Sequence, residues 1–448
     1  MRKLDSEGRP TMRQVYSFRL DRHDRPYQEL RAMCRISKDL YNQALYEIKR
    51  EQAASGKVLS YPELDRRLKQ MTNLDGQINY RLLPAQVAQQ TLRQLTSNVT
   101  AFFKALADYR RHPEKYFAAP RFPRFLPKLG HFVAIFTNQK ATITAQGHIK
   151  LTRHLAIEIP SREFTKYRNY WIGEASGRHQ PLFAQVRIVP KFGGRCLQIE
   201  IVYDRPVAAQ SPTTVRTAAV DLGVNNLAAL VDTAMGADDR PPLLINGRPL
   251  KSINQYYNKQ RARLQSELAQ TPAANGNHLW QMVIWRHDRL KDYFHKASRW
   301  IVRHCVAYEI GQLVIGHNPD WKQSVAIGRR NNQNFVQIPF NWLIDQLSYK
   351  AAMAGIAVTI LPESYTSKCS ALDLEPIAKH ADHAYAGRRV KRGLFRTAAG
   401  LLLNADVNGA LNILRKAIGD HFLEPFIKNV ARLTPSSGYL CYPIKLCL

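Results

Sequence analysis

Three acidic residues, far apart in the chain, stand at places from which carboxylates can converge on a divalent cation. Asp221 ends a strand-like apolar stretch, Glu363 follows the apolar run 355–360, and Asp406 opens a helical pattern over 404–419. Carboxylates at two strand ends and one helix start can hold Mg²⁺, which prefers acid and phosphate oxygens. On a basic chain, this set points to a nuclease.

The chain carries a large excess of positive charge. Its 448 residues include 65 Lys and Arg against 35 Asp and Glu, a formal net charge of +30, and its pI is near 10.0. Such an excess is typical of proteins that bind a polyanion, because each phosphate that a protein neutralises releases condensed counterions. The alternative is a surface charge that only keeps the protein in solution.

Cysteine use and hydropathy bear on where the protein works. No apolar run approaches the roughly 18 residues that a membrane-spanning helix needs, and the first residues lack the apolar core of a secretory signal. Scattered cysteines favour a reducing compartment over a disulfide framework. They stand at positions 34, 196, 305, 369, 441 and 447. We therefore expect a cytoplasmic protein associated with the nucleoid.

The first half of the chain combines β and helical patterns. Residues 15–20 alternate as a strand does, and residues 26–53 follow as a helix. A second helix has the narrow apolar seam of a helix that packs on helices, at Leu92, Leu95, Val99, Phe102 and Leu106. Residues 26–115 therefore predict a helical bundle inserted after one strand. Strand patterns from 131 to 203 predict an antiparallel β-domain that ends in a hairpin.

A Pro-rich segment follows the predicted bundle. The run from Pro120 alternates Pro, basic and aromatic residues, which excludes a helix and favours an extended segment. Its basic side chains can follow a phosphate backbone, while Phe122 and Phe125 can stack on bases. These basic residues are Arg121, Arg124 and Lys128. The alternative is a connector whose phenylalanines are buried.

The second half of the chain alternates strands and helices, as an α/β domain does. Strands are predicted at 217–221, 227–231, 243–246, 313–315 and 355–360, and helices at about 252–269, 278–309, 340–354 and 404–419. An irregular polar insert separates the last strand from the last helix.

Several segments together resemble the TnpB family of transposon-encoded RNA-guided nucleases, relatives of the type V CRISPR effectors. They read DLGVNN, GHNPDWKQ, NNQNF, ESYTSKCS and NADVNGALNIL. The resemblance implies a multidomain α+β protein, in which an antiparallel β-barrel-like wedge domain with an inserted helical bundle precedes an α/β RuvC-like domain of the RNase H fold. The implied domains are wedge (1–25 and 116–210), helical recognition (26–115), RuvC-like (211–362 and 402–425), a small basic insert at the degenerate zinc-ribbon position (363–401) and a tail (426–448).

Within this resemblance, Asp221 matches the first RuvC acid and Asp406 the third. The second acid usually stands directly after the strand predicted here at 313–315, but this position is Gly316. Because neighbouring strands lie about 4.8 Å apart, an acid just beyond the next strand can reach the same place. We therefore predict that Glu363 supplies the second acid.

Each acid has a structural alternative. Asp221 can be a turn residue, Asp406 can cap the helix that follows it, and Glu363 can be an ordinary surface glutamate. Glu309 and Asp320 are less suitable as second acids, because one precedes the strand at 313–315 and the other lies in a loop.

The resemblance implies two Mg²⁺ ions, bridged by Asp221 and held by Glu363 and Asp406, that hydrolyse a DNA phosphodiester. It also implies a guide RNA and a double-stranded target DNA with a short flanking motif. Two rival functions remain open. One is a nuclease-inactive, RNA-guided DNA-binding repressor, which Gly316 favours, and the other is an unguided DNA-binding accessory of transposition.

The insert holds an incomplete set of zinc ligands. Cys369 stands where the family carries a Cys-x-x-Cys pair, and with His380 and His383 it makes one ligand fewer than a closed site needs. Zinc is therefore not expected.

Two basic runs complete the predicted nucleic-acid surface. The members of the first, in the insert, are Arg388, Arg389, Lys391, Arg392 and Arg396. The second, Arg329 and Arg330, is expected near the guide–target duplex. The alternatives are a solvated basic loop and amides that cap helices.

Overall fold

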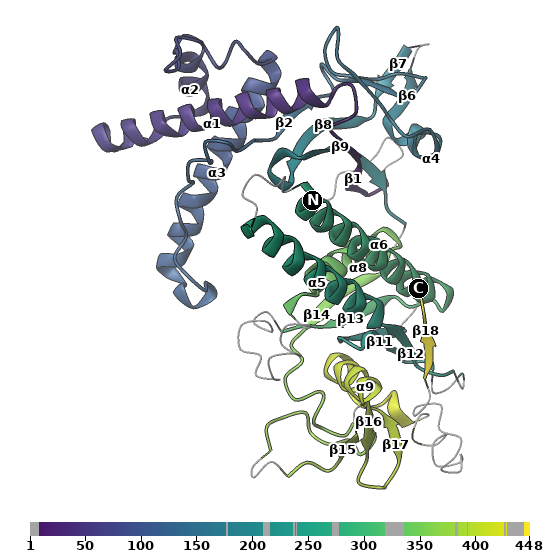
Figure 1. Ribbon diagram of the computed structural model, residues 1–448. Coiled ribbons are helices and arrows are strands. Elements are labelled where there is room, and N and C mark those ends of the chain that lie inside the picture. Colours follow the sequence, from purple (N-terminus) through teal and green to yellow (C-terminus); the bar gives the residue numbers. More distant parts are fainter. Residues whose placement is uncertain are drawn as a thin grey trace. The chain divides into compact units, whose positions relative to one another are not determined.

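A computed structural model describes residues 9–175, 178–208, 216–235, 238, 240–270, 277–318, 336–380, 384–391, 393–424, 427 and 443–448. The chain forms two compact units, Met1–Pro206 and Val207–Leu448, drawn in Figure 1. Both mix helices and strands, so the predicted α+β class is confirmed. No helix in the described parts is long and apolar enough to cross a membrane. Arg329, Arg330, His383 and Arg392 lie outside the described residues.

The main sheet of the first unit joins strands that are far apart in the sequence. Its antiparallel order is β1-β9-β8-β2, formed by β1 (Thr11–Leu20), β9 (Cys196–Pro206), β8 (Phe183–Lys191) and β2 (Ala134–Thr137). The β8–β9 hairpin is the one that the sequence predicts. Its turn, η2 (Phe192–Gly194), has positive φ angles at Gly193 and Gly194, which glycine adopts without strain.

Three helices lie between β1 and β2 in the sequence: α1 (Tyr27–Ser55), α2 (Tyr61–Leu68) and α3 (Ala85–Arg111). A capping box between Ser60 and Glu63 begins α2. The predicted seam of α3 is buried at Leu92, Leu95 and Val99 and only half-buried nearer the end of the helix. Those helices therefore share one core with the sheet.

The remainder of the first unit was only partly predicted. A small antiparallel sheet holds β3 (Thr142–Ile143), β4 (His148–Lys150) and β5 (Ala156–Glu158), and the turn η1 (Pro113–Lys115) follows α3. The sequence patterns missed α4 (Ser161–Trp171) and the hairpin β6 (Ile172–Ala175)–β7 (Arg178–Pro181). Trp171 is fully buried in this unit.

The second unit contains one mixed sheet of order β14-β13-β10-β11-β12-β18. Its members are β10 (Thr217–Leu222), β11 (Asn226–Asp232), β12 (Leu243–Asn246), β13 (Gln312–Gly316), β14 (Ala357–Leu361) and β18 (Ile444–Leu446). The first three run antiparallel, whereas β13 and β14 run parallel to β10. The strand β18, which pairs in parallel with β12, was not predicted.

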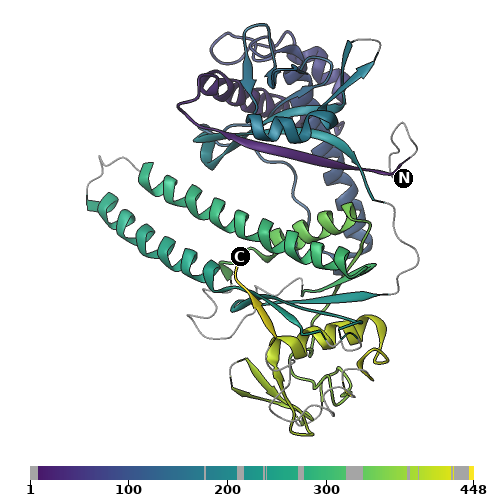
Figure 2. The same ribbon diagram turned by 90° about the vertical axis from the view of Figure 1, so that its right-hand side faces the viewer.

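Helices cover both faces of this sheet. Figure 2 shows α5 (Arg248–Gln270), α6 (Asn277–Ala307) and α8 (Phe340–Met353) on one face and α9 (Ala405–Ile418) on the other. The helix α9 packs on β10 and β11, so its first turn lies against the strand that carries Asp221. One apolar core includes side chains from the sheet and all four helices.

The insert between β14 and α9 is more regular than the sequence indicates. It contains an antiparallel sheet of β15 (Arg388–Lys391), β16 (Leu394–Arg396) and β17 (Leu402–Asn404). The expectation of an irregular insert was therefore wrong over this sheet. The strand β15 is exposed along its length, and β16 and β17 have only three residues each, so these strands leave little periodicity in the sequence.

Candidate metal centre

Asp221 lies in β10, opposite Ala229 of β11. The alternative that it is a turn residue is therefore wrong. Its carboxylate lies against α9: a Cβ added to Gly409 would stand 2.5 Å from Asp221 Oδ2. Because real Cβ contacts are longer, only a residue without a side chain lets the helix approach this acid so closely.

Glu363 lies where a side chain on residue 316 would otherwise be. In the parallel pair β13–β14, Gly316 is opposite Leu361, and Glu363 follows two residues later. A Cβ added to Gly316 would stand 2.6 Å from Glu363 Oε1 and 2.8 Å from its Cγ. The carboxylate thus returns to the end of β13, as the sequence predicts, whereas its role as a ligand stays a prediction. Its Oε1 is buried, so the alternative of an ordinary surface glutamate was wrong.

Asp406 enters the site from the first turn of α9. Asn404 caps this helix, since its side chain accepts hydrogen bonds from the backbone N–H groups of Asp406 and Val407. The alternative that Asp406 is the cap is therefore wrong. Its carboxylate instead accepts a hydrogen bond of 2.7 Å from Asn226 Nδ2.

Asn226, at the start of β11, is a site residue that the sequence patterns missed. It is 9% exposed, and its Oδ1 is buried without a hydrogen-bond partner. A buried acceptor without a donor is costly, and a cation or its bound water would satisfy it. The only signal in the sequence was its place five residues after Asp221, in DLGVNN.

The three acids share one electrostatic environment. The pKa of Asp221 lies well above its usual value because the carboxyl is desolvated and because Glu363 and Asp406 are close; Arg389 opposes this rise. Burial raises the pKa of Glu363 to about 7, and Lys416 opposes it. Carboxylates that repel one another form a good site for a hard divalent cation, above all where an acceptor lacks a donor. Glu363 Oε1 is such an acceptor without a partner.

The described basic residues of the insert are exposed, as nucleic-acid contacts require: Arg388, Arg389, Lys391 and Arg396. Arg389 also opposes the rise in the pKa of Asp221, so strand β15 lies near the acids. None of this identifies their ligand, so their role stays a prediction.

The Pro-rich segment lies on α1 in the first unit. Asn42 accepts from the backbone N–H of Leu126 at 2.8 Å and donates to its carbonyl at 3.0 Å. Phe122 is half-buried and packs edge-on against Phe102, with ring centroids 5.1 Å apart, as the alternative of buried phenylalanines predicts, whereas its stacking on bases stays a prediction. By contrast Phe125 is 48% exposed, and the ammonium of Lys49 lies 4.7 Å from its ring centroid. The basic residues beside them, Arg121, Arg124 and Lys128, are exposed.

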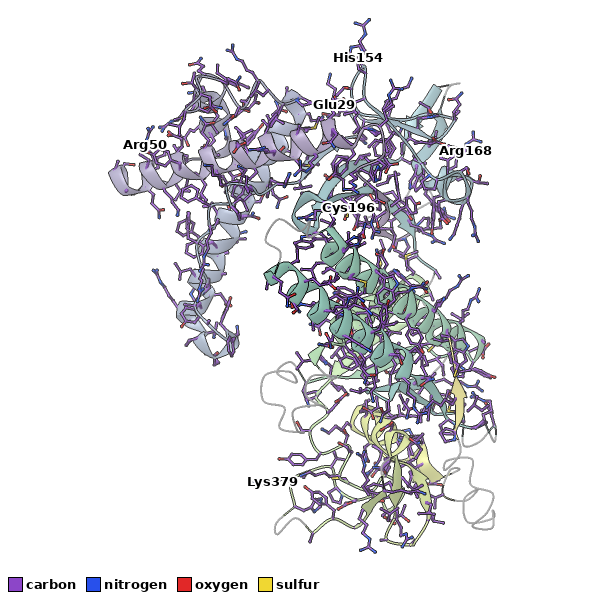
Figure 3. The ribbon with its side chains drawn as sticks, viewed as in Figure 1. Glu29, Arg50, His154, Arg168, Cys196 and Lys379 are labelled. Carbon is purple, nitrogen blue, oxygen red and sulfur yellow. The ribbon has the colours of Figure 1, made fainter. Side chains whose placement is uncertain are left out.

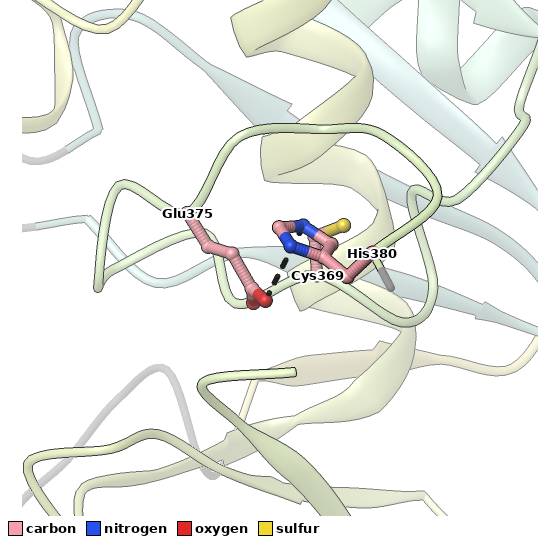
Figure 4. Close-up of side chains that lie close together, drawn as sticks. All are labelled: Cys369, Glu375 and His380. Atoms are coloured by element: carbon pink, nitrogen blue, oxygen red, sulfur yellow. Dashed lines mark ion pairs between the residues drawn. The ribbon is translucent and has the colours of Figure 1, made fainter. Parts of the chain in front are cut away.

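A second group of potential metal ligands lies in the insert. Within the described residues, Cys369, Glu375 and His380 have ligand atoms within 4.8 Å of one another (Figure 4). The sequence patterns named the first and last of these as possible zinc ligands and missed Glu375. The acid is 6% exposed, and its carboxylate lies 3.6 Å from His380 Nε2.

The ligand atoms of this group already have hydrogen-bond partners. Cys369 Sγ donates to the carbonyl of Ala378, and His380 Nε2 is 2.9 Å from that of Pro376. Glu375 accepts from the N–H groups of Ser370 at 2.6 Å and Ala386 at 2.9 Å. With three ligand residues, the group is also one ligand short of a closed structural zinc site. The group therefore does not fit a structural zinc ion.

Buried polar side chains of α9 hold this part of the insert instead. Asn408 exchanges hydrogen bonds with the Cys369 carbonyl and the Ala371 N–H. Asn412 Nδ2 donates to the carbonyls of Thr366 and Cys369 at 2.8 and 2.7 Å. The helix α9 therefore has two roles. Its first turn carries Asp406, and its Asn408 and Asn412 side chains hold the insert through hydrogen bonds.

Comparisons with known proteins agree with this arrangement. A family model described as "Probable transposase" (OrfB_IS605) matches residues 200–322. A second, described as "Cas12f1-like, TNB domain", matches residues 340–413. The two matches cover β10 to β13 and α8 to α9, and thus the strands and helix that carry the three acids.

Two curated relatives were found. "TnpB-like protein ORF457" of Acidianus two-tailed virus is 27% identical over 52% of this chain and 50% of its own length, so the match spans half of that relative. "Putative RNA-guided DNA endonuclease InsQ" of Escherichia coli (strain K12) is 23% identical over 90% of this chain and 91% of its own length.

Among solved structures, a chain of the "Cryo-EM structure of the Cas12f1-sgRNA-target DNA complex" is 13% identical, with a TM-score of 0.49 over 86% of this chain and 82% of that chain. Together, the two family models and the two curated relatives support the resemblance of this chain to the TnpB family.

Proposed function

We propose that this chain is an RNA-guided DNA endonuclease of a transposable element, which cuts its target by Mg²⁺-dependent phosphodiester hydrolysis. In this proposal, the second unit holds a RuvC-like domain of the RNase H fold, and the first holds a barrel-like wedge domain with a helical recognition domain. The strand order β14-β13-β10-β11-β12 supports the first assignment, since it places Asp221 on β10 and Glu363 just beyond β14, the two strands that flank β13.

One observation carries the proposal of an active site. The carboxylate of Glu363 fills the space next to Gly316, although that position on β13 has no acid of its own. The Oε1 atom of Glu363 is buried without a hydrogen-bond partner, and such burial is costly unless the carboxylate binds a ligand. Burial and the charges of Glu363 and Asp406 raise the pKa of Asp221, so the three carboxyls are close enough to interact.

The residues of the chain have distinct parts in this proposal. Asp221, Glu363 and Asp406 would hold Mg²⁺, which activates water and stabilises the leaving 3′ oxygen when bound. Asn226 holds Asp406 through its amide, and Gly409 leaves room for Asp221. The three acids are not among the groups of described residues whose ligand atoms all lie within 4.8 Å of one another, so in this proposal they would hold more than one ion.

Recognition of a guide and a target is assigned from charge and from the relatives. The relative InsQ, named an RNA-guided DNA endonuclease, aligns over 90% of this chain. The net charge of +30 suits a protein that carries an RNA together with a DNA duplex. Exposed Arg121, Arg124 and Lys128 in the first unit and Arg388 in the second are the proposed phosphate contacts.

The test begins with the nucleic acid that purifies with the chain. Its sequence defines a plasmid target, flanked by randomised bases, for incubation with and without Mg²⁺. We expect Mg²⁺-dependent cuts that Asp221→Asn abolishes. Asp292→Asn, an exposed acid of α6 paired with Lys296, is the matched control and should cut as the wild type does. Binding without cuts in the wild type would contradict the proposal.

A second candidate is a nuclease-inactive, RNA-guided DNA-binding protein. The observation that favours it is Gly316, which leaves β13 without an acid. It predicts RNA-dependent target binding that Asp221→Asn leaves unchanged and no cutting in any divalent metal. An unguided accessory protein would instead purify without stoichiometric RNA.

A further inference from the structure

Lys416 connects α9 to the turn that carries Glu363. It lies in the last turn of this helix, whereas Asp406 lies in the first. Its ammonium donates to the carbonyl of Pro362 at 3.1 Å and to that of Ser364 at 2.8 Å. These two residues flank Glu363 in the sequence, so the helix that carries one acid also holds the backbone around another.

The other backbone groups of this turn are held as well. The N–H of Glu363 donates to Asn318 Oδ1 at 2.9 Å, just beyond β13. Its carbonyl accepts from the N–H and the hydroxyl of Thr366 at 3.2 and 2.8 Å. The turn is therefore fixed from β13, from its own next residues and from α9.

The charge of Lys416 does not explain its place. The Lys416 ammonium would repel a divalent cation bound nearby, and its charge lowers the pKa of Glu363. The two hydrogen bonds that Lys416 donates explain its position better than its charge does. An acid on β13 would be fixed by the ladder of a central strand, whereas Glu363 stands on a turn two residues beyond β14 and needs other supports.

We propose that Lys416 is a positioning residue, which holds the turn 362–364 so that the Glu363 carboxylate stays beside Gly316 in the metal centre. This inference rests on the proposed function and deepens it. It gives α9 a second role in the site, because the helix then supports Glu363, an acid that lies outside the strands of the sheet.

The test uses the full chain with its co-purified RNA and compares three variants. Lys416→Met removes the donors, Lys416→Arg keeps the charge and offers donors, and Lys368→Met is the matched control. Lys368 is an exposed lysine in the same loop, near the ring of Tyr385. Mn²⁺ binding is measured by electron paramagnetic resonance, and cleavage is measured against Mg²⁺ concentration at saturating DNA.

We expect Lys416→Met to weaken Mn²⁺ binding about fivefold and to slow cleavage about tenfold, the effect of losing a pair of charge-assisted hydrogen bonds. Affinity for target DNA should stay within about twofold of wild type, which separates this loss from weaker substrate binding. Lys416→Arg should recover most of both losses, and Lys368→Met should show neither.

Two results would overturn the inference while leaving the proposed function intact. Tighter Mn²⁺ binding in Lys416→Met would mean that this lysine acts only through its charge. Unchanged Mn²⁺ binding and cleavage would mean that the turn needs no support from α9. A wild type that binds Mn²⁺ but cuts no DNA would instead contradict the proposed endonuclease, and the Mn²⁺ comparison would still decide on the role of Lys416.

Discussion

Two groups of potential metal ligands in the second unit differ in one physical respect. At the strand ends, the acceptors Glu363 Oε1 and Asn226 Oδ1 are buried without donors. In the insert, Cys369, Glu375 and His380 stand closer together, yet hydrogen bonds already engage their ligand atoms. Proximity of suitable side chains is therefore a weaker sign of a metal site than acceptors left without partners.

The largest expected effect comes from exchanging one acid of each group for its amide. Glu363→Gln should reduce cleavage by about 10³-fold or more, because it removes a negative ligand from the metal centre. Glu375→Gln should keep the cleavage chemistry and lower stability by roughly 1–3 kcal/mol, because an amide replaces a buried charged acceptor. Plasmid cleavage and thermal unfolding of both variants measure these effects. Equal cleavage by the two variants would contradict the proposed difference between the two groups of ligands.

A smaller effect is expected from Gly409→Ala. The new Cβ would stand 2.5 Å from Asp221 Oδ2, so this carboxylate must turn away from its present place. We expect cleavage to fall by about 10- to 100-fold. Alanine favours a helix over glycine by about 1 kcal/mol, so the melting temperature should not fall with it. A parallel loss of stability and activity would point to general damage instead.

Metal analysis examines the insert directly. Because Cys369, Glu375 and His380 do not fit a structural zinc ion, protein purified without added metal should contain much less than one zinc ion per chain. Treatment with a chelator should leave its melting temperature unchanged. Stoichiometric zinc, lost together with stability on chelation, would contradict the hydrogen-bonded arrangement described for this group.

The smallest expected effect concerns the pH dependence of stability in metal-free protein. The folded state raises the pKa of Glu363 from 4.5 to about 7, so it keeps a proton that the unfolded chain releases. Stability should therefore fall as pH rises from 4.5 to about 7, by on the order of 2 kcal/mol from this group. Glu363→Gln should make this fall with pH smaller, as should saturating Mg²⁺, whereas Asp221, whose pKa is also raised, still contributes in the variant. Unfolding in denaturant at pH 5 and pH 7.5 measures both.

The sequence predicted the strands and helices that position the centre better than it predicted the insert. The strand around residues 217–221 and the helix that follows Asn404 are long, periodic and buried, and such patterns depend on local spacing. The exposed strand β15 has no such pattern. Asn226 was missed because an amide after a strand usually satisfies a turn, and only the fold places it against Asp406.

By itself, the sequence determined the three acids, the gap at Gly316, the positive charge and the alternation of elements in the second unit, because these follow from residue type and local periodicity. The tertiary structure alone decided that Gly409 admits Asp221 and that Lys416 donates to the carbonyls on either side of Glu363. It also decided that Cys369 and His380 are engaged in hydrogen bonds. Such relations join residues far apart in the chain, and they depend on how side chains pack and on which buried polar atoms find partners.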